Sequence, residues 1–282
     1  MAEDRTFTAA SRQLRGMGLP HYEITMKGPK GTSVDVMPSN EILNDLGRLK
    51  RGNRGGCHVY IRGPRDADHD LVLLDDISRF TPEKMKASGH DPAVVVQTSP
   101  GSIQAWVRLG RPVSAKVRHE VARELAALYG GDRAAVNPHQ AGRLAGFTNQ
   151  KPEHKGPKGF PYVLLLNAPG QPAPDAERLI DDAAIKAAQA EERLKAMMVD
   201  ELQISASGDA HRDLVAAWTT EYAKQIQPDL SKVDWWIVNL GLGRDVHPDV
   251  LASALAAVAD RKGKHAIDYA ERTVRKALSE RR

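Results

Sequence analysis

The stretch from Val94 to Leu109, VVVQTSPGSIQAWVRL, predicts two neighbouring strands joined by a tight turn. β-Branched and aliphatic residues fill both arms, as is typical of strands that are at least half buried. Between the arms, Ser-Pro-Gly-Ser at 99–102 is a turn sequence with proline and glycine at its centre. We therefore expect these residues to form a β-hairpin.

The segments around this hairpin mix helix and strand patterns. Strands are predicted at HYEITMKG (21–28), HVYIRG (58–63) and LVLLDD (71–76). Helices are predicted at TFTAASRQLRGMG (6–18), PSNEILNDLGRLKRGN (38–53) and SAKVRHEVARELAALYGG (114–131). Because the strands neither alternate strictly with helices nor follow one another in a single run, we expect an α+β domain.

The composition changes near residue 167. The segment NAPGQPAPD (167–175) carries three prolines and a glycine, which is typical of a domain boundary. An alanine- and charge-rich helix follows it, and helical patterns then continue to the end of the chain. We expect a catalytic domain over 1–168, a linker and connecting helix over 169–203, and a C-terminal all-α helical bundle over 204–282.

Composition narrows the class of protein. With 41% hydrophobic and 27% charged residues among 282, the chain is a folded one rather than a disordered one. No stretch approaches the roughly 18 consecutive apolar residues of a membrane span, and the N-terminus lacks the apolar core of a secretory signal. The single cysteine, Cys57, excludes an internal disulfide and a cysteine-built zinc site, and it fits a reducing cytoplasm. The net charge of +4 permits a phosphate-bearing partner without requiring one.

Asp75 and Asp76 directly follow the apolar run LVLL and are candidate metal ligands. Carboxylates at the end of a buried strand supply hard oxygens on rigid backbone, which Mg²⁺ prefers. Adjacent strand residues point to opposite faces, so both acids reach one site only if the strand ends or bulges there. The alternative is that two aspartates simply end the strand. Asp132, just after Gly130-Gly131, is an ordinary loop acid unless it joins this pair.

Two further segments are rich in hydrogen-bond donors. The turn of the predicted hairpin offers hydroxyls and backbone N–H groups that suit phosphate oxygens. A plain hairpin turn beside a buried tryptophan is the alternative, and the pattern alone favours it. The segment GRLAGFTNQK (142–151) sets Arg143, Asn149 and Lys151 in glycine-rich backbone, and Lys155 and Lys158 follow. Such donors suit a triphosphate or a nucleic-acid backbone, and a solvated basic loop is the alternative. The spacing is not that of a Walker A loop.

Five motifs, in this order, resemble one family. VYIRG, LVLLDDISRF, VVVQTSPGSIQAWV, YGGD and GRLAGFTNQK are similar in order and spacing to RepB-type primases. These are DNA primases of broad-host-range mobilisable plasmids and belong to the archaeo-eukaryotic primase superfamily. DLSKVDWWIV and HAIDYAERTVRKAL also resemble the helical-bundle domain of that family, so the resemblance runs from about residue 5 to residue 280.

The resemblance implies a fold and an activity. The fold is a mixed-sheet catalytic domain followed by a connecting helix and a helical bundle. The activity is that of a DNA-directed primase, a nucleotidyltransferase that makes short primers de novo on single-stranded plasmid origin DNA. The expected cofactor is a pair of Mg²⁺ or Mn²⁺ ions held by Asp75, Asp76 and Asp132, without zinc, and nucleoside triphosphates are the substrates.

The same resemblance assigns the nucleotide-binding residues, and a separate hypothesis concerns the helical bundle. The expected nucleotide- and phosphate-binding residues are Arg62, Thr98, Ser99, Gln104, Arg143, Asn149 and Lys151. Contacts to DNA or to the first nucleotides are expected from Tyr269, Arg272 and Lys276, which share one helical face. The expected partners are the single-stranded template with an origin hairpin, a plasmid helicase and an origin-binding protein. No membrane partner is expected, and the location is the bacterial cytoplasm.

Two features depart from the family pattern. The superfamily typically spaces its first acids as Asp-x-Asp, whereas Asp75 and Asp76 are adjacent. Many relatives carry histidine where this chain has Gln104, which hydrogen-bonds but carries no charge.

Two other classes remain open. The main alternative is a non-catalytic protein that binds single-stranded origin DNA and recruits a host polymerase. Such a binder has no use for three carboxylates beside a phosphate-binding surface, because they repel DNA. A metal-dependent nuclease is the third interpretation, and it needs no triphosphate-binding segment.

Overall fold

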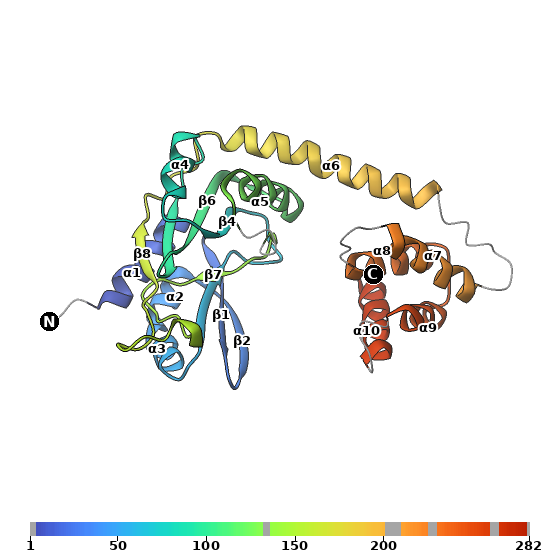
Figure 1. Ribbon diagram of the computed structural model, residues 1–282, viewed down its shortest axis with the longest axis horizontal. Coiled ribbons are helices and arrows are strands. Elements are labelled where there is room, and N and C mark those ends of the chain that lie inside the picture. The colour runs from blue at the N-terminus through green and yellow to red at the C-terminus, as the bar shows by residue number, and fades with distance from the viewer. Residues whose placement is uncertain (1–3, 132–135, 201–209, 225–229, 260–264, 281–282) are drawn as a thin grey trace. The chain divides into compact units, whose positions relative to one another are not determined.

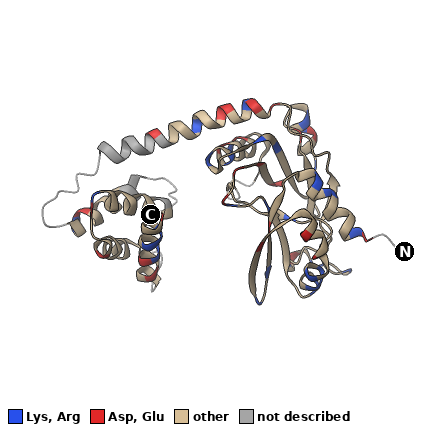
Figure 2. Ribbon diagram, turned by 180° about the vertical axis from the view of Figure 1, so that it is seen from behind, with Lys and Arg blue, Asp and Glu red and all other residues tan. Residues whose placement is uncertain are grey.

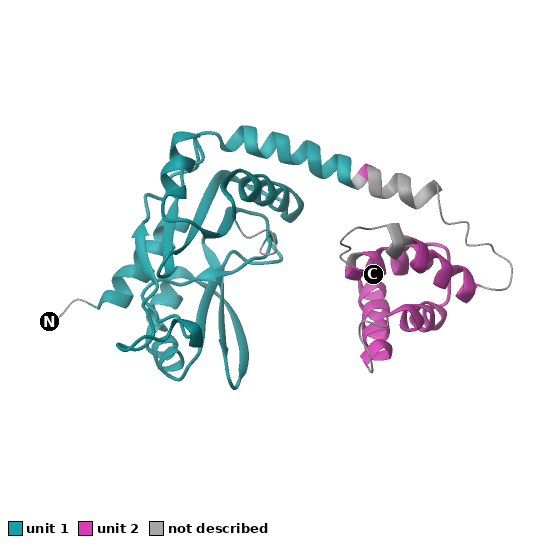
Figure 3. Ribbon diagram, in the orientation of Figure 1, with its two compact units in different colours: residues 1–190 teal, residues 191–282 magenta. Residues whose placement is uncertain are grey.

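The computed structural model describes residues 4–131, 136–200, 210–224, 230–259 and 265–280. The chain divides into two compact units, residues 1–190 and 191–282 (Figures 1 and 3). Among the helices so described, none is both long enough and apolar enough to cross a bilayer.

The first sheet has the strand order β2-β1-β3-β7. Its strands are β1 (His21–Gly28), β2 (Gly31–Pro38), β3 (His58–Arg62) and the short β7 (Gly142–Arg143). β1 and β3 confirm the predicted strands, whereas β2 and β7 were not anticipated. β2 has only two valines and is exposed or half-exposed along its whole length, so it shows no buried alternation. It forms because β1 pairs with it residue by residue from His21–Pro38 to Gly28–Gly31.

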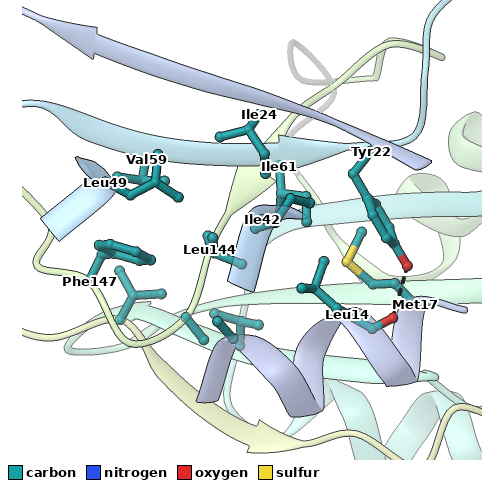
Figure 4. Close-up of a cluster of buried hydrophobic side chains, with 14 of the residues drawn as sticks. Leu14, Met17, Tyr22, Ile24, Ile42, Leu49, Val59, Ile61, Leu144 and Phe147 are labelled. Atoms are coloured by element: carbon teal, nitrogen blue, oxygen red, sulfur yellow. Dashed lines mark hydrogen bonds between the residues drawn. The ribbon is translucent and has the colours of Figure 1, made fainter. Parts of the chain in front are cut away.

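Three helices pack on one face of this sheet. α1 (Arg5–Met17) begins at the Asp4 cap and ends at Gly18, whose φ of 70° is left-handed. The helix predicted over 38–53 is divided into α2 (Ser39–Asn44) and α3 (Leu46–Arg54). Figure 4 shows the core that these helices share with the sheet, in which the Tyr22 hydroxyl donates to the Leu14 carbonyl over 2.8 Å.

The second sheet has the order β4-β6-β5-β8. Its strands are β4 (His69–Ile77), β5 (Val94–Ser99), β6 (Ser102–Val113) and β8 (Leu164–Asn167). The predicted hairpin is confirmed, because β5 and β6 pair across a turn in which Ser99 faces Ser102. Gly101 has a φ of 89°, which explains why glycine follows proline at the turn.

The expectation of a mixed sheet is wrong for the described residues, in which every pairing of named strands is antiparallel. β4 connects to β5 through α4 (Thr81–Ala87), and these two strands run parallel to each other. They are not neighbours, because β6 lies between them and runs antiparallel to both. The α+β class itself is confirmed.

The outer face of the second sheet is covered by helices. α5 (Ala115–Tyr129), capped by Ser114, and the first half of α6 (Ala176–Asp200) bury apolar side chains in a second core. Leu179, Ile180 and Ala183 of α6 are almost fully buried there. The first unit therefore extends to residue 190, beyond the expected boundary at 168, because this part of α6 packs on the domain.

The second unit contains α7 (Ala210–Lys224), α8 (Leu230–Gly243), α9 (Pro248–Val258) and α10 (Ala266–Ser279). These helices share a separate hydrophobic core in which Trp218 is fully buried and Trp236 is 9% exposed.

Candidate active site

The acidic pair lies in an irregular part of β4. Pairing with β6 shifts register between Leu74 and Ile77, and Asp76 has a φ of 55°, which is rare for a residue other than glycine. This is a β-bulge at the two acids, and a bulge changes the direction of the side chains it contains. The bulge therefore allows Asp75 and Asp76 to reach one site, which a regular strand would not allow.

Hydrogen bonds from β6 show that both carboxylates lie on one face of the sheet. The Ser102 hydroxyl donates to Asp76 Oδ1 over 2.7 Å, and Gln104 Nε2 donates to Asp75 Oδ1 over 3.0 Å. Ser102 and Gln104 are two residues apart on one strand, so their side chains point the same way. Asp75 and Asp76 consequently converge, with Asp75 half-buried and Asp76 exposed.

Gln104 also connects the acids to the first sheet. Its side chain is 4% exposed, and its Oε1 accepts the backbone N–H of Arg143 over 2.8 Å. Gly142 precedes Arg143 on β7, and only glycine fits there because a Cβ would lie 2.6 Å from the Trp106 ring. The amide of Gln104 thus orients Asp75 and fixes the position of Arg143, rather than reaching outward to a phosphate.

Arg143 is a buried cation beside this pair. Its Nη1 donates to His58 Nδ1 over 3.0 Å, and its guanidinium lies 5.1 Å from the centre of the Tyr60 ring. Burial lowers the pKa of Arg143, an effect that Tyr60 and Asp75 oppose. Burial together with the charges of Arg143 and Lys151 lowers the pKa of His58 to about 4. His58 is therefore neutral at pH 7 and accepts a hydrogen bond from Arg143.

Three other predicted residues hold the hairpin turn in place. Asn149 Nδ2 donates to the Thr98 carbonyl over 2.8 Å, and the Thr98 hydroxyl contacts Ser102. Thr98, Ser99 and Asn149 are all buried. Lys151, two residues after Asn149, has a side chain that is 51% exposed, and its Nζ lies 3.7 Å from Glu153 Oε1.

Arg62 is engaged elsewhere. It pairs with the buried carboxylate of Glu23 on β1 and donates to the His139 carbonyl. Asp132 lies outside the described residues. Its neighbour Gly131 packs against β4, since a Cβ there would lie 3.4 Å from the carbonyl oxygen of Asp75.

The predicted residues of the second unit lie on α10. Tyr269 donates from its hydroxyl to the buried Asp234 of α8 over 2.6 Å, and Lys276 Nζ lies 5.1 Å from the centre of the Trp235 ring. Arg272 donates to the Asp268 carbonyl and is exposed.

The donor set of the acidic pair fits a divalent ion of the Mg²⁺ class. Two carboxylates held on one face supply hard oxygen ligands, and the bulge gives them a shared direction. Within the ranges that the structure describes, no three His, Cys, Asp or Glu side chains form a metal-binding group. Asp132, the third ligand expected from the sequence, lies outside those ranges.

Sequence reasoning missed two parts of this site. Ser102 was treated as a turn residue, although its spacing of two from Gln104 placed both on one face. His58 and Tyr60 were read only as strand residues, and their contact with Arg143 depends on the unanticipated pairing of β3 with β7.

Comparisons with known proteins agree with this architecture. Residues 14–193 match the model of the RepB DNA-primase N-terminal domain. The chain is 35% identical to Mobilization protein A of Escherichia coli over 99% of its own length, and it spans 41% of that longer protein. It is 32% identical to a DNA primase of Acidithiobacillus ferrooxidans, with 85% of this chain and 72% of that protein covered.

A solved structure is also similar. The catalytic domain of primase RepB′, in complex with initiator DNA, matches with a TM-score of 0.63 and 37% identity, covering 67% of this chain and 98% of the other. The family match spans well over half of the chain and includes the acidic pair, the hairpin and Arg143. This chain belongs to the RepB-type family of plasmid DNA primases.

Proposed function

We propose that this chain makes short primers de novo on single-stranded plasmid origin DNA, and that the reaction takes place at Asp75 and Asp76. The observation that carries the assignment is the bulge in β4, which brings both carboxylates to the face where Ser102 and Gln104 bind them. Two convergent carboxylates repel DNA, so they suit a metal-dependent reaction better than simple DNA binding.

Asp75, Asp76 and Asp132 would hold Mg²⁺ or Mn²⁺. Such ions, when bound, activate the attacking 3′-hydroxyl and stabilise the pyrophosphate leaving group. The chain's own contribution is to hold the ligands still. Gln104 fixes Asp75, and Ser102 fixes Asp76, so little reorganisation is needed when substrate binds.

The triphosphate of the incoming nucleotide would lie beside Arg143 and Lys151. Arg143 is buried, so its charge acts in a medium of low dielectric constant and is poorly screened by water. Lys151 is exposed and acts as a more mobile cation. We assign Thr98, Ser99 and Asn149 to the shape of the phosphate-binding turn, and Gln104 and Arg62 to positioning through Asp75 and Glu23.

The rest of the chain supports initiation in this proposal. Residues 1–168 would carry the catalytic chemistry, and 204–282 would form a helical bundle. The segment 169–203 would connect them, with the first half of α6 packed on the first unit. Arg272 and Lys276, with Tyr269, would contact the first nucleotides or an origin hairpin. The initiator DNA in the complex of RepB′ supports DNA as the partner of this chain. A plasmid helicase and an origin-binding protein would act alongside it in the bacterial cytoplasm.

Primer synthesis from labelled nucleotides on single-stranded DNA, with Mg²⁺ or Mn²⁺, tests this proposal. The wild type should give template-dependent oligomers and Asp76→Ala none. Asp66→Ala, which removes an exposed acid just before β4, is the matched control and should retain activity. Equal activity in Asp76→Ala would remove the site assignment. Tight DNA binding without product from the wild type on any template would favour a non-catalytic initiator.

A further inference from the structure

The first sheet has a core face and an outer face. Tyr22, Ile24, Val59 and Ile61 point toward α1 and the other core helices (Figure 4). The alternate residues point the opposite way, and the pairing register aligns them in three rows across the strands. The rows are Val36–Glu23–Arg62, Val34–Thr25–Tyr60–Arg143 and Thr32–Lys27–His58.

The outer face carries two exposed apolar side chains on β2. Val36 is 61% exposed and Val34 45%, and they are successive residues on this face of β2. Thr25 and Tyr60 beside them are half-buried. Neighbouring exposed β-branched and aromatic side chains on an open sheet mark a binding surface more often than isolated ones do.

This face is continuous with the candidate active site. The middle row runs from Val34 at the sheet edge to Arg143, whose backbone N–H is bound by Gln104, the residue that also holds Asp75. Along the row, exposure falls from 45% at Val34 to 5% at Arg143. A ligand that lies along the row therefore ends at Arg143, which shares the side chain of Gln104 with Asp75.

The charge of the face suits a polyanion. The hairpin of β1 and β2 carries Lys27 near its tip and Lys30 in the turn itself (Figure 2). Among the residues of the three rows, all of which the structure describes, the one carboxylate is Glu23. Both Arg62 and Arg65 bind that carboxylate, so it presents no unpaired negative charge to a ligand.

We propose that the outer face of the first sheet binds single-stranded DNA and leads it to the acidic pair. Bases pack on Tyr60, Val34 and Val36, because every base has an apolar face that stacks without regard to sequence. Phosphates lie beside Lys27 and Lys30. The assignment rests on the proposed function for its direction toward Asp75, whereas DNA binding by this face is measured separately from primer synthesis.

The first test introduces charge at exposed positions that the fold does not need. Val34→Asp and Val36→Asp should each weaken binding of a fluorescein-labelled, unstructured oligonucleotide about tenfold at low salt, because each places a carboxylate against the phosphates. Leu166→Asp is the matched control, since Leu166 is 50% exposed on β8 at the edge of the second sheet. Its affinity should stay within about twofold of the wild type. Val36→Lys should strengthen binding.

The second test concerns Tyr60. Tyr60→Ala should weaken DNA binding roughly tenfold, and Tyr60→Phe should retain it, because stacking needs the ring rather than the hydroxyl.

The third test is kinetic. With the Val36→Asp enzyme, the KM for template should rise while the KM for nucleotide and the kcat at saturating template stay unchanged. A rise in nucleotide KM alone would place the incoming nucleotide, not the template, on this face.

Unchanged DNA affinity in both aspartate variants would overturn the proposal. So would a shift in sedimentation coefficient with unchanged affinity, which would make the face a contact between copies of this chain. If the wild type fails to make primers but Val36→Asp still weakens DNA binding, the proposed function fails and this inference stands.

Discussion

The two sheets of the first unit differ in regularity, and the difference corresponds to their proposed roles. In the first sheet, each pairing keeps its register from end to end. In the second sheet, every pairing contains a register shift, and the shift in β4 contains the acidic pair. A regular sheet presents an even face, whereas an irregular one can direct two adjacent side chains to one point.

The largest expected effect is that of removing one charge at the bulge. Asp75→Asn keeps the size of the side chain, and we expect primer synthesis to fall at least about 100-fold because metal binding needs the carboxylate charge. The rate of labelled nucleotide incorporation checks this. Asp35→Asn, an acid of the regular sheet that pairs with Arg48, is the control and should stay within about twofold. Equal losses in both would erase the distinction between the sheets.

The next effect concerns the residue that connects the sheets. Gln104→Leu leaves the Arg143 N–H without its acceptor and Asp75 without its donor, so we expect a loss of about 10- to 100-fold in kcat/KM. Gln104→His should retain more activity, since an imidazole can supply one donor and one acceptor. Urea unfolding of both variants separates folding from activity. Equal activities for the two variants would show that these hydrogen bonds do not matter.

Acid should act on the second sheet through His69. This residue is 7% exposed, and burial, with the charge of Arg118, holds its pKa at about 3. Below pH 6.5 the unfolded chain takes up a proton that the folded chain does not, so the free energy of unfolding falls as the pH falls toward 3.

Between pH 7 and pH 5 this group should contribute a loss of about 2 kcal/mol. Urea unfolding at both pH values measures the total, and His69→Gln should reduce the difference by about that amount. A pH dependence unchanged in His69→Gln would mean that this histidine titrates normally in the folded protein.

The smallest effect is expected on the open face of the regular sheet. Val36→Thr replaces one exposed β-branched side chain by another, so the free energy of unfolding should change by less than about 0.5 kcal/mol. Urea unfolding checks it. A much larger loss would show that Val36 is covered in the folded protein.

The sequence predicted the elements whose residues carry their own signals. The β5–β6 hairpin followed from its Pro-Gly turn, and α5 from its helical spacing of apolar residues and the glycine pair. β3 and β4 followed from their β-branched and aliphatic residues. β2, β7 and β8 were missed, since they are short or exposed and exist only through their partners. The prediction of a mixed sheet was wrong because the residues of a strand do not show which strands it pairs with or in which direction they run.

At the site, the sequence by itself determined which groups were available: two adjacent acids after a buried strand, a donor-rich turn, and a basic segment with Arg143. It also showed that the two acids can share a site only where the strand is irregular, since side chains alternate along any regular strand. Only the tertiary structure decided that the strand bulges at Asp75 and Asp76, and that Ser102 and Gln104 bind them from one side. It also decided that Gln104 serves Asp75 and Arg143, while Arg62 serves Glu23. The physical reason is that register shifts and hydrogen-bond partners depend on residues far apart in the chain, which no local pattern records.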